Sequence, residues 1–213
     1  MYLVKTPWWL RRLYPGLEWR MPGRSPGSTN VPHLYLTFDD GPHEQATPFV
    51  LDQLAQFGAK ASFFCIGKNV VRYPQLFARI QAEGHSIGNH TQHHVNGWKT
   101  PEDDYLREII LCQETMPATP LFRPPYGRIS RSQIKALRQK PDLPQRIIMW
   151  DVLSGDFDLD LSPENCLKNV VDHAGPGSIV VFHDSTKAWE KLQFVLPRVL
   201  QHFSEKGFGF AAL

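Results

Sequence analysis

Short apolar runs alternate along the chain with longer segments in which apolar residues recur at helical spacing. Short apolar runs between turn residues are typical of buried strands, and a period of three to four residues is typical of amphipathic helices. The pattern predicts strands at residues 34–38, 61–66, 85–88, 121–122, 146–150, 178–182 and 208–211. It predicts helices between them, at residues 48–57, 74–83, 101–115, 130–139, 163–173 and 189–204.

Strands that alternate with helices favour a parallel sheet, either doubly wound or closed into a barrel. The length of 213 residues suits one α/β domain. Residues 1–33 are rich in Pro, Gly and Arg after Trp8 and Trp9, so we expect an N-terminal extension that packs on a body formed by residues 34–213.

Three predicted helices begin with a hydroxyl residue followed by proline: Thr47–Pro48, Thr100–Pro101 and Ser162–Pro163. A hydroxyl at the N-cap accepts a hydrogen bond from an otherwise unpaired N–H group, and proline is well tolerated at the first helical position. We therefore expect each hydroxyl to cap its helix.

The charge balance argues against nucleic acid as a partner. Lys and Arg number 23 and Asp and Glu 21, for a net charge of +2. A basic cluster near the start (Arg11, Arg12, Arg20 and Arg24) is explained equally well by a solvated face.

No stretch reaches the roughly 18 apolar residues that a membrane span requires. Neither a signal-peptide core nor a cysteine framework is visible, since Cys65, Cys112 and Cys166 are widely spaced. We expect Cys65 to be a small core residue, a cytoplasmic location and a monomeric protein.

Side chains that could take part in catalysis or bind a metal cluster where predicted strands end. The carboxyl ends of parallel strands meet at one edge, which is where α/β enzymes build their sites. The candidates at these ends are Asp39, Asp40, His90, His93, His94, Arg123, Asp151, Asp156, Asp158, His183 and Asp184. For the pair Asp184–Ser185 we expect the start of a helix rather than part of a hydrolase triad.

The spacing of His90 and His94 would place both imidazoles on one face of a helical turn, although His93 is a rival partner for His90. Asp40 could supply a third, oxygen ligand. Two imidazoles and a carboxylate with open positions suit Zn²⁺ in hydrolases, and also Co²⁺, Fe²⁺ or Mn²⁺. Bound metal would offset the repulsion between the adjacent carboxylates of Asp39 and Asp40.

The motifs "TFDDGP", "HTQHH", "RPPYG" and "VVFHD", in this order, resemble those of the polysaccharide deacetylases of the NodB-homology type, carbohydrate esterase family 4. The resemblance covers roughly residues 34–184. It implies an irregular (β/α) barrel of about seven parallel strands in a single domain. It also implies hydrolysis of acetyl groups on N-acetylated sugars, or of O-acetyl groups on xylan, with one divalent metal ion.

Residue by residue, the resemblance makes Asp39 the catalytic base and Asp40, His90 and His94 the metal ligands. Zinc is the first expectation, with cobalt, nickel, iron or manganese as alternatives. His93 then becomes a neighbour of the ligands or a surface residue.

The remaining roles are also implied by the resemblance. His183 matches the general acid, and Arg123 matches the arginine that orients the catalytic aspartate. Asp156 would orient His183 or that arginine, and the backbone N–H of Tyr126 would donate to the oxyanion.

Four further side chains are predicted to line the pocket for the acetyl group and the sugar: Pro124, Trp150, Phe157 and Phe182. The sequence departs from the family here, because Phe157 stands where tryptophan is usual. The loss of the indole N–H makes the shape of the sugar site uncertain. The extension at 1–33 and the loop at 95–100, with Trp98, are expected to shape the groove.

The expected partner is an acetylated sugar or oligosaccharide. Two other functions stay open: hydrolysis of a C–N bond in a non-sugar amide, and carbohydrate binding without catalysis. The motifs do not distinguish chitooligosaccharide, peptidoglycan, xylan or a small metabolite, nor N- from O-deacetylation.

Overall fold

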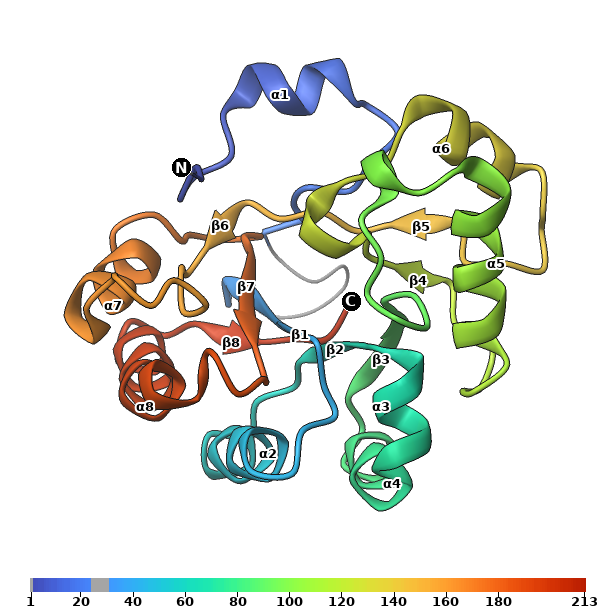
Figure 1. The fold of residues 1–213 in the computed structure, drawn as a ribbon. Helices are drawn as coiled ribbons and strands as arrows, with labels where there is room; N and C mark the ends of the chain where they lie inside the picture. Colours follow the sequence, from blue (N-terminus) through green and yellow to red (C-terminus); the bar gives the residue numbers. More distant parts are fainter. Residues whose placement is uncertain (1, 24–30) are drawn as a thin grey trace.

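A computed structural model describes residues 2–23 and 31–213. Its sheet is parallel throughout, in the order β5-β4-β3-β2-β1-β7-β6, and β8 pairs with the start of β1 (Figure 1). The strands are β1 (His33–Asp39), β2 (Ser62–Cys65), β3 (Ser86–Asn89), β4 (Leu121–Phe122), β5 (Arg146–Ile147), β6 (Val152–Leu153), β7 (Ile179–His183) and β8 (Gly209–Phe210).

Helices surround the strands in Figure 1, and α1 lies across the top of that view. The α-helices are α1 (Trp8–Leu13), α2 (Ala46–Gln56), α3 (Gly67–Arg72), α4 (Pro74–Ala82), α5 (Glu102–Gln113), α6 (Arg131–Arg138), α7 (Pro163–Val171) and α8 (Trp189–Glu205). Two short 3-10 helices, η1 (Gly97–Lys99) and η2 (Pro125–Gly127), lie in loops. No helix among the described residues is both long and apolar enough to cross a membrane.

The sheet curls because its two edge strands are consecutive along the chain. β5 and β6 stand at opposite ends of the strand order, yet only residues 148–151 separate them. Four residues span at most about 14 Å, so the two edges must come close together. The fold is therefore the irregular (β/α) barrel that the family resemblance implied, and not the doubly wound sheet that the pattern also allowed.

The N-terminal segment lies along the seam between these edges. Lys5 forms an antiparallel bridge with Val152 of β6, and Glu18 forms a parallel bridge with Ile148. Backbone N–H groups and carbonyls that an open edge would leave exposed are thereby paired, which also removes a template for association with another chain.

The pleat of β1 separates the outer core from the barrel interior. Leu34, Leu36 and Phe38 pack outward in the largest core cluster, against α2 and α8 among others. Tyr35 packs in a different cluster with Phe64 and Ile148. Since successive strand residues point to opposite faces, Thr37 and Asp39 share the inner face with Tyr35.

The predicted helices are all present, with ends within two residues of the expected bounds. Five elements were not predicted: α1, α3, β6, η1 and η2. Each has six residues or fewer, which is too short for a periodic pattern to identify. The predicted strand at 146–150 is shorter than expected, because after Ile147 the chain crosses the seam toward β7.

Two of the three predicted helix caps are wrong. Ser162 does cap α7, where its hydroxyl accepts a hydrogen bond from Asn165 N at 3.2 Å. Thr47, by contrast, lies inside the first turn of α2, and its hydroxyl binds Asp184. At α5 the cap position is taken by Pro101, and the Thr100 hydroxyl donates to Asn96 O instead.

Buried Asp151 anchors the N-terminal segment to the barrel. Its carboxylate is fully buried and pairs with Lys5 Nζ at 2.8 Å, with Arg20 Nη1 at 2.5 Å and with the guanidinium of Arg11. Ser178 Oγ donates to the same carboxylate at 2.6 Å. Arg11 and Arg20 are thus ion-pair partners and not merely a solvated face; Arg12 is exposed, and Arg24 lies outside the described residues.

The substitution Asp151→Asn should lower the free energy of unfolding by about 1.5–3 kcal/mol, because it removes charged hydrogen bonds to a buried carboxylate. Urea denaturation measures this. The control is Glu18→Gln, which removes a half-exposed pair with Arg146 at 2.8 Å and should cost about 0–1 kcal/mol. Equal losses in the two variants would contradict the anchoring role.

Candidate active site

Several strands deliver polar side chains to one edge of the barrel. Asp39 ends β1, and His183 ends the neighbouring strand β7, where the two residues are register partners. Arg123 directly follows β4, and His90 directly follows β3. The carboxyl ends of parallel strands therefore bring together residues that lie up to 144 positions apart in the chain.

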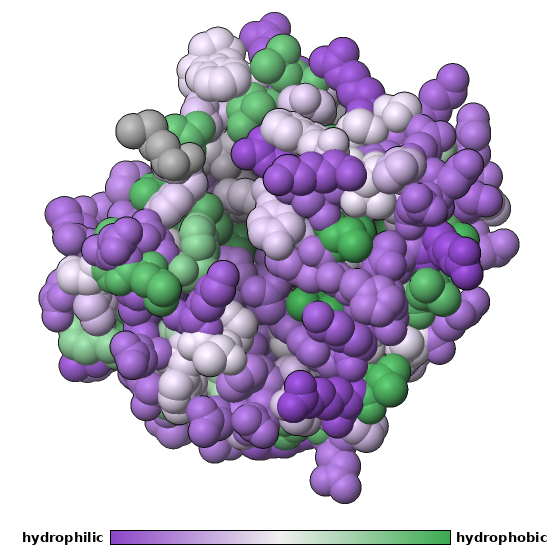
Figure 2. Space-filling view, viewed as in Figure 1, coloured by the Kyte–Doolittle hydropathy of each residue, from purple (hydrophilic) through white to green (hydrophobic). Residues whose placement is uncertain are grey.

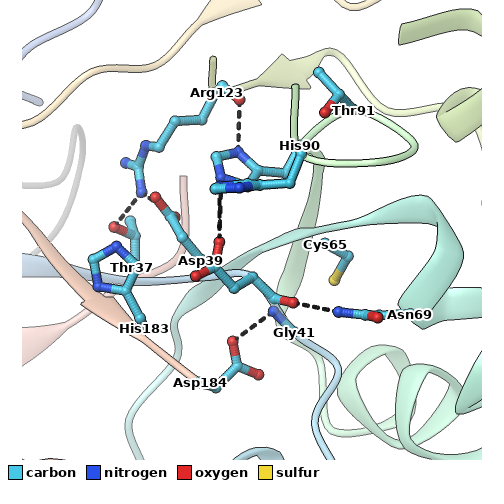
Figure 3. Close-up of polar contacts among 12 residues, drawn as sticks. Thr37, Asp39, Gly41, Cys65, Asn69, His90, Thr91, Arg123, His183 and Asp184 are labelled. Atoms are coloured by element: carbon cyan, nitrogen blue, oxygen red, sulfur yellow. Dashed lines mark hydrogen bonds and ion pairs between the residues drawn. The ribbon is translucent and has the colours of Figure 1, made fainter. Parts of the chain in front are cut away.

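Asp39 is held by a buried arginine. Arg123 Nη1 donates to Asp39 Oδ1 at 2.6 Å and to Thr37 Oγ1 at 2.7 Å (Figure 3). Arg123 is fully buried, and Asp39 is 4% exposed. Both charges are therefore desolvated, and a planar guanidinium in a closed environment leaves the carboxylate little freedom to rotate.

Asp40 leaves the strand in a left-handed conformation, with φ of 80°. A strand residue in the normal pleat would point to the face opposite Asp39. The left-handed turn instead brings Asp40 Oδ1 to 3.2 Å from His94 Nε2 and 3.7 Å from His90 Nε2. The side chains of Asp39 and Asp40, although adjacent in the chain, can thereby both point into the same site from the end of β1.

His90 and His94 come from an irregular loop. The predicted helical turn is wrong, because Thr91 and His94 have φ of 63° and 59°, which no right-handed helix accommodates. The loop nevertheless brings the two rings together, tilted by 48° with centroids 5.1 Å apart. The rival His93 is excluded: it is exposed, and its Nδ1 lies 2.9 Å from Glu108 Oε1.

His90 is neutral and oriented. Its Nδ1 lies 2.7 Å from the carbonyl of Arg123, so Nδ1 carries the proton and Nε2 keeps its lone pair. Burial, with the neighbouring His94, lowers the pKa of His90 to about 4. A neutral imidazole fixed by a backbone carbonyl is the form in which histidine binds metals.

Asp40, His90 and His94 fit a divalent cation. One ligand atom from each lies within 4.8 Å of the others, and donors at about 2 Å from a tetrahedral ion would stand about 3.3 Å apart. Asp40 Oδ1 is buried, and among the described residues no donor is aligned on it. Burial alone would raise the pKa of Asp40, but the imidazoles of His94, His183 and His90 hold it well below its usual range. The carboxylate is thus ionised and ready to accept a cation.

His183 and Asp156 form a second buried pair. Asp156 Oδ1 lies 2.7 Å from His183 Nδ1, and Asp156 Oδ2 accepts a hydrogen bond from the backbone N of His183 at 2.7 Å. Burial alone would lower the pKa of His183, but Asp156, with Asp40 and Asp39, raises it to about 10. The imidazole is therefore protonated at neutral pH. Asp156 contacts His183 and not Arg123, which decides between the two partners that the sequence left open.

A cavity of about 1050 Å³ opens onto these groups. Figure 2 shows a hollow below α1 with hydrophobic side chains at its margin. Its wall includes Asp39, Asp40, His90, His94 and His183, and the predicted pocket residues Pro124, Tyr126, Trp150 and Phe157. The N-terminal segment contributes Tyr2, Leu3, Thr6, Pro7, Leu10, Tyr14, Leu17 and Trp19, and the loop at 95–100 contributes Asn96 and Trp98. Both segments shape the groove, as the sequence predicted.

Phe182 does not line this cavity, so that prediction is wrong. It is fully buried on the outer face of β7 and stacks on Phe38 with ring centroids 5.8 Å apart. The pleat places Val181 and His183 on the cavity side instead. Phe157 lies beside His183 and Tyr2, with ring centroids 5.2 and 5.1 Å away.

Tyr126 and Trp150 form the mouth of the cavity. Tyr126 has φ of 59° and is 60% exposed, and its ring centroid is 4.6 Å from that of His94. Glycine is required next to it, because a Cβ on Gly127 would stand 2.5 Å from the Trp150 ring. The close approach of these two segments sets the width of the opening.

Thr37 was missed at the sequence level, and Asp184 was given the wrong structural role there. Thr37 and Asp39 both accept hydrogen bonds from Arg123 Nη1. Thr37 lies two residues before Asp39 on the same strand, so alternation along the strand could have placed both side chains on one face. Asp184 does not begin a helix, since α8 starts at Trp189. It is fully buried and accepts hydrogen bonds from Gly41 N and Thr47 Oγ1.

Comparison with known proteins agrees with the family resemblance that the sequence motifs carry. A family model described as polysaccharide deacetylase matches residues 27–141. A peptidoglycan-N-acetylglucosamine deacetylase of Bacillus cereus is 36% identical over 194 residues, covering 88% of this chain and 69% of the relative. A chitooligosaccharide deacetylase of Azorhizobium caulinodans is 35% identical over 161 residues, covering 73% of this chain and 75% of the relative.

Solved structures resemble the whole barrel. The crystal structure of the Bc1960 peptidoglycan N-acetylglucosamine deacetylase, in complex with a 4-naphthalen-1-yl-N-oxidanyl-benzamide, superposes with a TM-score of 0.83 at 33% identity, over 96% of this chain and 93% of that one. A family 4 carbohydrate esterase from Streptomyces lividans, in complex with acetate, has a TM-score of 0.74 at 26% identity, over 86% of this chain and 93% of that one.

The His183–Asp156 pair should make the stability of the metal-free protein depend on pH. The pKa of His183 is raised to about 10 in the folded state, above its ordinary value near 6.5. Its contribution to the free energy of unfolding should be complete below about pH 6.5 and lost as the pH rises through about 10. Urea denaturation of chelator-treated protein between these values measures the decline.

The variant Asp156→Asn should flatten this decline. The matched control is Asp172→Asn, which removes an exposed carboxylate that pairs with Lys168 and should leave the pH dependence unchanged. An unaltered slope in Asp156→Asn would show that the pair does not hold the proton.

Proposed function

Because the chain belongs to the polysaccharide deacetylase family, we propose that it is a metal-dependent hydrolase that removes acetyl groups from an N-acetylated carbohydrate and releases acetate. The observation that carries this proposal is the convergence of three groups at one end of the cavity. These are the Asp40–His90–His94 triad, the Asp39–Arg123 pair and the His183–Asp156 pair.

Asp40, His90 and His94 would hold the cation. A bound divalent ion supplies a Lewis acid that polarises the acetyl carbonyl and acidifies water. Zinc agrees with the two-imidazole, one-carboxylate donor set, and cobalt, nickel, iron and manganese remain candidates.

Asp39 is the proposed base. Arg123 occupies Oδ1, and among the described residues no hydrogen bond reaches Oδ2. This second oxygen can take the proton from the water that attacks the acetyl carbon. Arg123 keeps the carboxylate oriented, and a positioned general base contributes about a hundred- to ten-thousandfold in rate.

His183 and Tyr126 complete the proposed reaction. Asp156 holds Nδ1 of His183, so the Nε2–H is left to protonate the departing sugar amine. The backbone N–H of Tyr126 is the proposed donor to the oxyanion, a role worth about a hundred- to a thousandfold for one such group.

The named relatives indicate the sugar. The two Bacillus cereus relatives are named peptidoglycan-N-acetylglucosamine deacetylases, and the Azorhizobium relative is named a chitooligosaccharide deacetylase. We therefore propose N-acetylglucosamine as the unit that is deacetylated. Aromatic side chains at the mouth of the cavity, among them Tyr126 and Trp98, supply flat faces that suit sugar rings.

Acetate release from chitooligosaccharides, peptidoglycan fragments and acetylated xylan tests this assignment. The metal-loaded protein should release acetate from the first or second class, and a chelator should abolish the release. No acetate from any of these substrates, with the metal bound, would favour the alternatives of a non-sugar amide substrate or a non-catalytic protein.

Two substitutions should separate metal binding from proton transfer. Asp39→Asn should keep the metal and lower kcat by about a hundred- to ten-thousandfold, because it removes the base alone. His90→Ala should lose the metal and the activity together. Elemental analysis and acetate release on both purified variants measure this, and a normal metal content in His90→Ala would overturn the ligand assignment.

A further inference from the structure

Asp184 is a buried acid that neither the proposed metal site nor the proposed proton transfers use. It follows β7 directly after His183 and is fully buried. Both carboxylate oxygens are engaged: Gly41 N donates to Oδ1 at 3.0 Å, and Thr47 Oγ1 donates to Oδ2 at 2.5 Å. Among the described residues, its side-chain partners are thus a backbone N–H and a hydroxyl, neither of which carries a positive charge. Burying an unpaired carboxyl group is costly, so its position calls for an explanation.

The segment that Asp184 contacts is the turn that aims Asp40. Asp40 has φ of 80°, a left-handed conformation that is strained for a residue other than glycine. Such a conformation persists only where the surroundings hold it. Without the turn, Asp40 would project to the face of β1 opposite Asp39, away from His90 and His94.

Four hydrogen bonds hold the backbone of this turn. Two come from α3 and its N-cap, since Asn69 Nδ2 donates to Asp40 O at 2.7 Å and Ile66 N donates to Gly41 O at 3.0 Å. The other two come from Asp184, whose backbone N donates to Asp39 O at 3.1 Å and whose carboxylate accepts from Gly41 N (Figure 3). Asp184 therefore holds the backbone on both sides of Asp40, at Asp39 and at Gly41.

The packing at Gly41 is equally specific. A Cβ at this position would stand 2.0 Å from Asp184 Oδ2 and 2.5 Å from its Cγ. The carboxyl group thus packs directly against the Gly41 backbone and occupies the space that a side chain would need. Asp184 therefore holds Gly41 in place by van der Waals contact as well as by the hydrogen bond from Gly41 N.

We propose that Asp184 is a positioning residue for Asp40: its buried carboxyl group fixes the Gly41 backbone and so directs the Asp40 carboxylate toward His90 and His94. The proposal rests on the proposed role of Asp40 as a metal ligand. It places Asp184 outside the reacting groups, so its loss should weaken metal binding without altering the contacts to the substrate.

The test measures zinc affinity directly, by competition between chelator-treated protein and a chromophoric chelator. Asp184→Ala removes the acceptor for Gly41 N and should weaken zinc binding about ten- to a hundredfold, the range typical of residues that orient metal ligands. Asp184→Asn keeps an oxygen for Gly41 N and should retain zinc affinity close to that of the unsubstituted protein. With the metal in excess, KM should change little in either variant.

Thr47→Val is the matched control. It removes the hydroxyl that joins Asp184 to α2 but leaves the hydrogen bond to Gly41 N in place. Thermal unfolding should show a loss of stability, while zinc affinity should stay unchanged. A general loosening of this region would instead weaken zinc binding in Thr47→Val and in Asp184→Ala alike.

Unchanged zinc affinity in folded Asp184→Ala would overturn the proposal, as would equal weakening in Asp184→Asn and Asp184→Ala. If Asp184→Ala does not fold, Asp184→Ser provides the same comparison with less lost volume. The proposed function fails separately: zinc that binds tightly, depends on Asp184 and yet supports no acetate release would leave the positioning role standing and reject the deacetylase assignment.

Discussion

One buried guanidinium connects the parts of the site. Arg123 donates to Asp39 and Thr37 of β1, and to the carbonyls of Ile148 and Met149 at 3.2 and 3.1 Å in the segment that crosses the seam. Its Cζ lies 4.1 Å from the centroid of the Phe64 ring on β2, and its own carbonyl orients His90. A charge this deeply buried is tolerated only with such partners. The proposed base and the crossing segment therefore depend on the Arg123 side chain, and the proposed ligand His90 depends on the backbone carbonyl of the same residue.

The charge balance around this residue explains why a cation suits the site. Asp39 pairs with Arg123, and Asp156 pairs with His183, so each of these carboxylates has a cationic partner. Asp40 faces two imidazoles, one of which, His90, has a pKa lowered to about 4 and is neutral at pH 7. Among the described residues no Lys or Arg side chain pairs with its carboxylate, and a divalent ion would supply a positive charge there. The proposed base Asp39, the proposed ligand Asp40 and the proposed acid His183 thus differ in their charged neighbours, and these neighbours suit each residue to its role.

The N-terminal segment turns a barrel end into an enclosed cavity. Its anchor is electrostatic, through the three cations around Asp151, and its contribution to the cavity wall is largely apolar and aromatic. Trp150 and Asp151 are neighbours in the chain, so the residue that holds the segment adjoins one that shapes the mouth. The position of the N-terminal segment and the position of Trp150 are consequently coupled, although the segment lies more than a hundred positions from Trp150 in the chain.

The sequence by itself determined the order of strands and helices and the placement of Asp39, His90, Arg123 and His183 at strand ends, because periodicity and turn residues are local properties. Only the tertiary structure decided which neighbours those residues meet. The left-handed turn at Asp40, the irregular loop from His90 to His94 and the outward face of Phe182 each depend on contacts between distant segments. Asp184 is the clearest case, since a residue that looks like a helix start is drawn inward by the N–H of Gly41, 143 positions away.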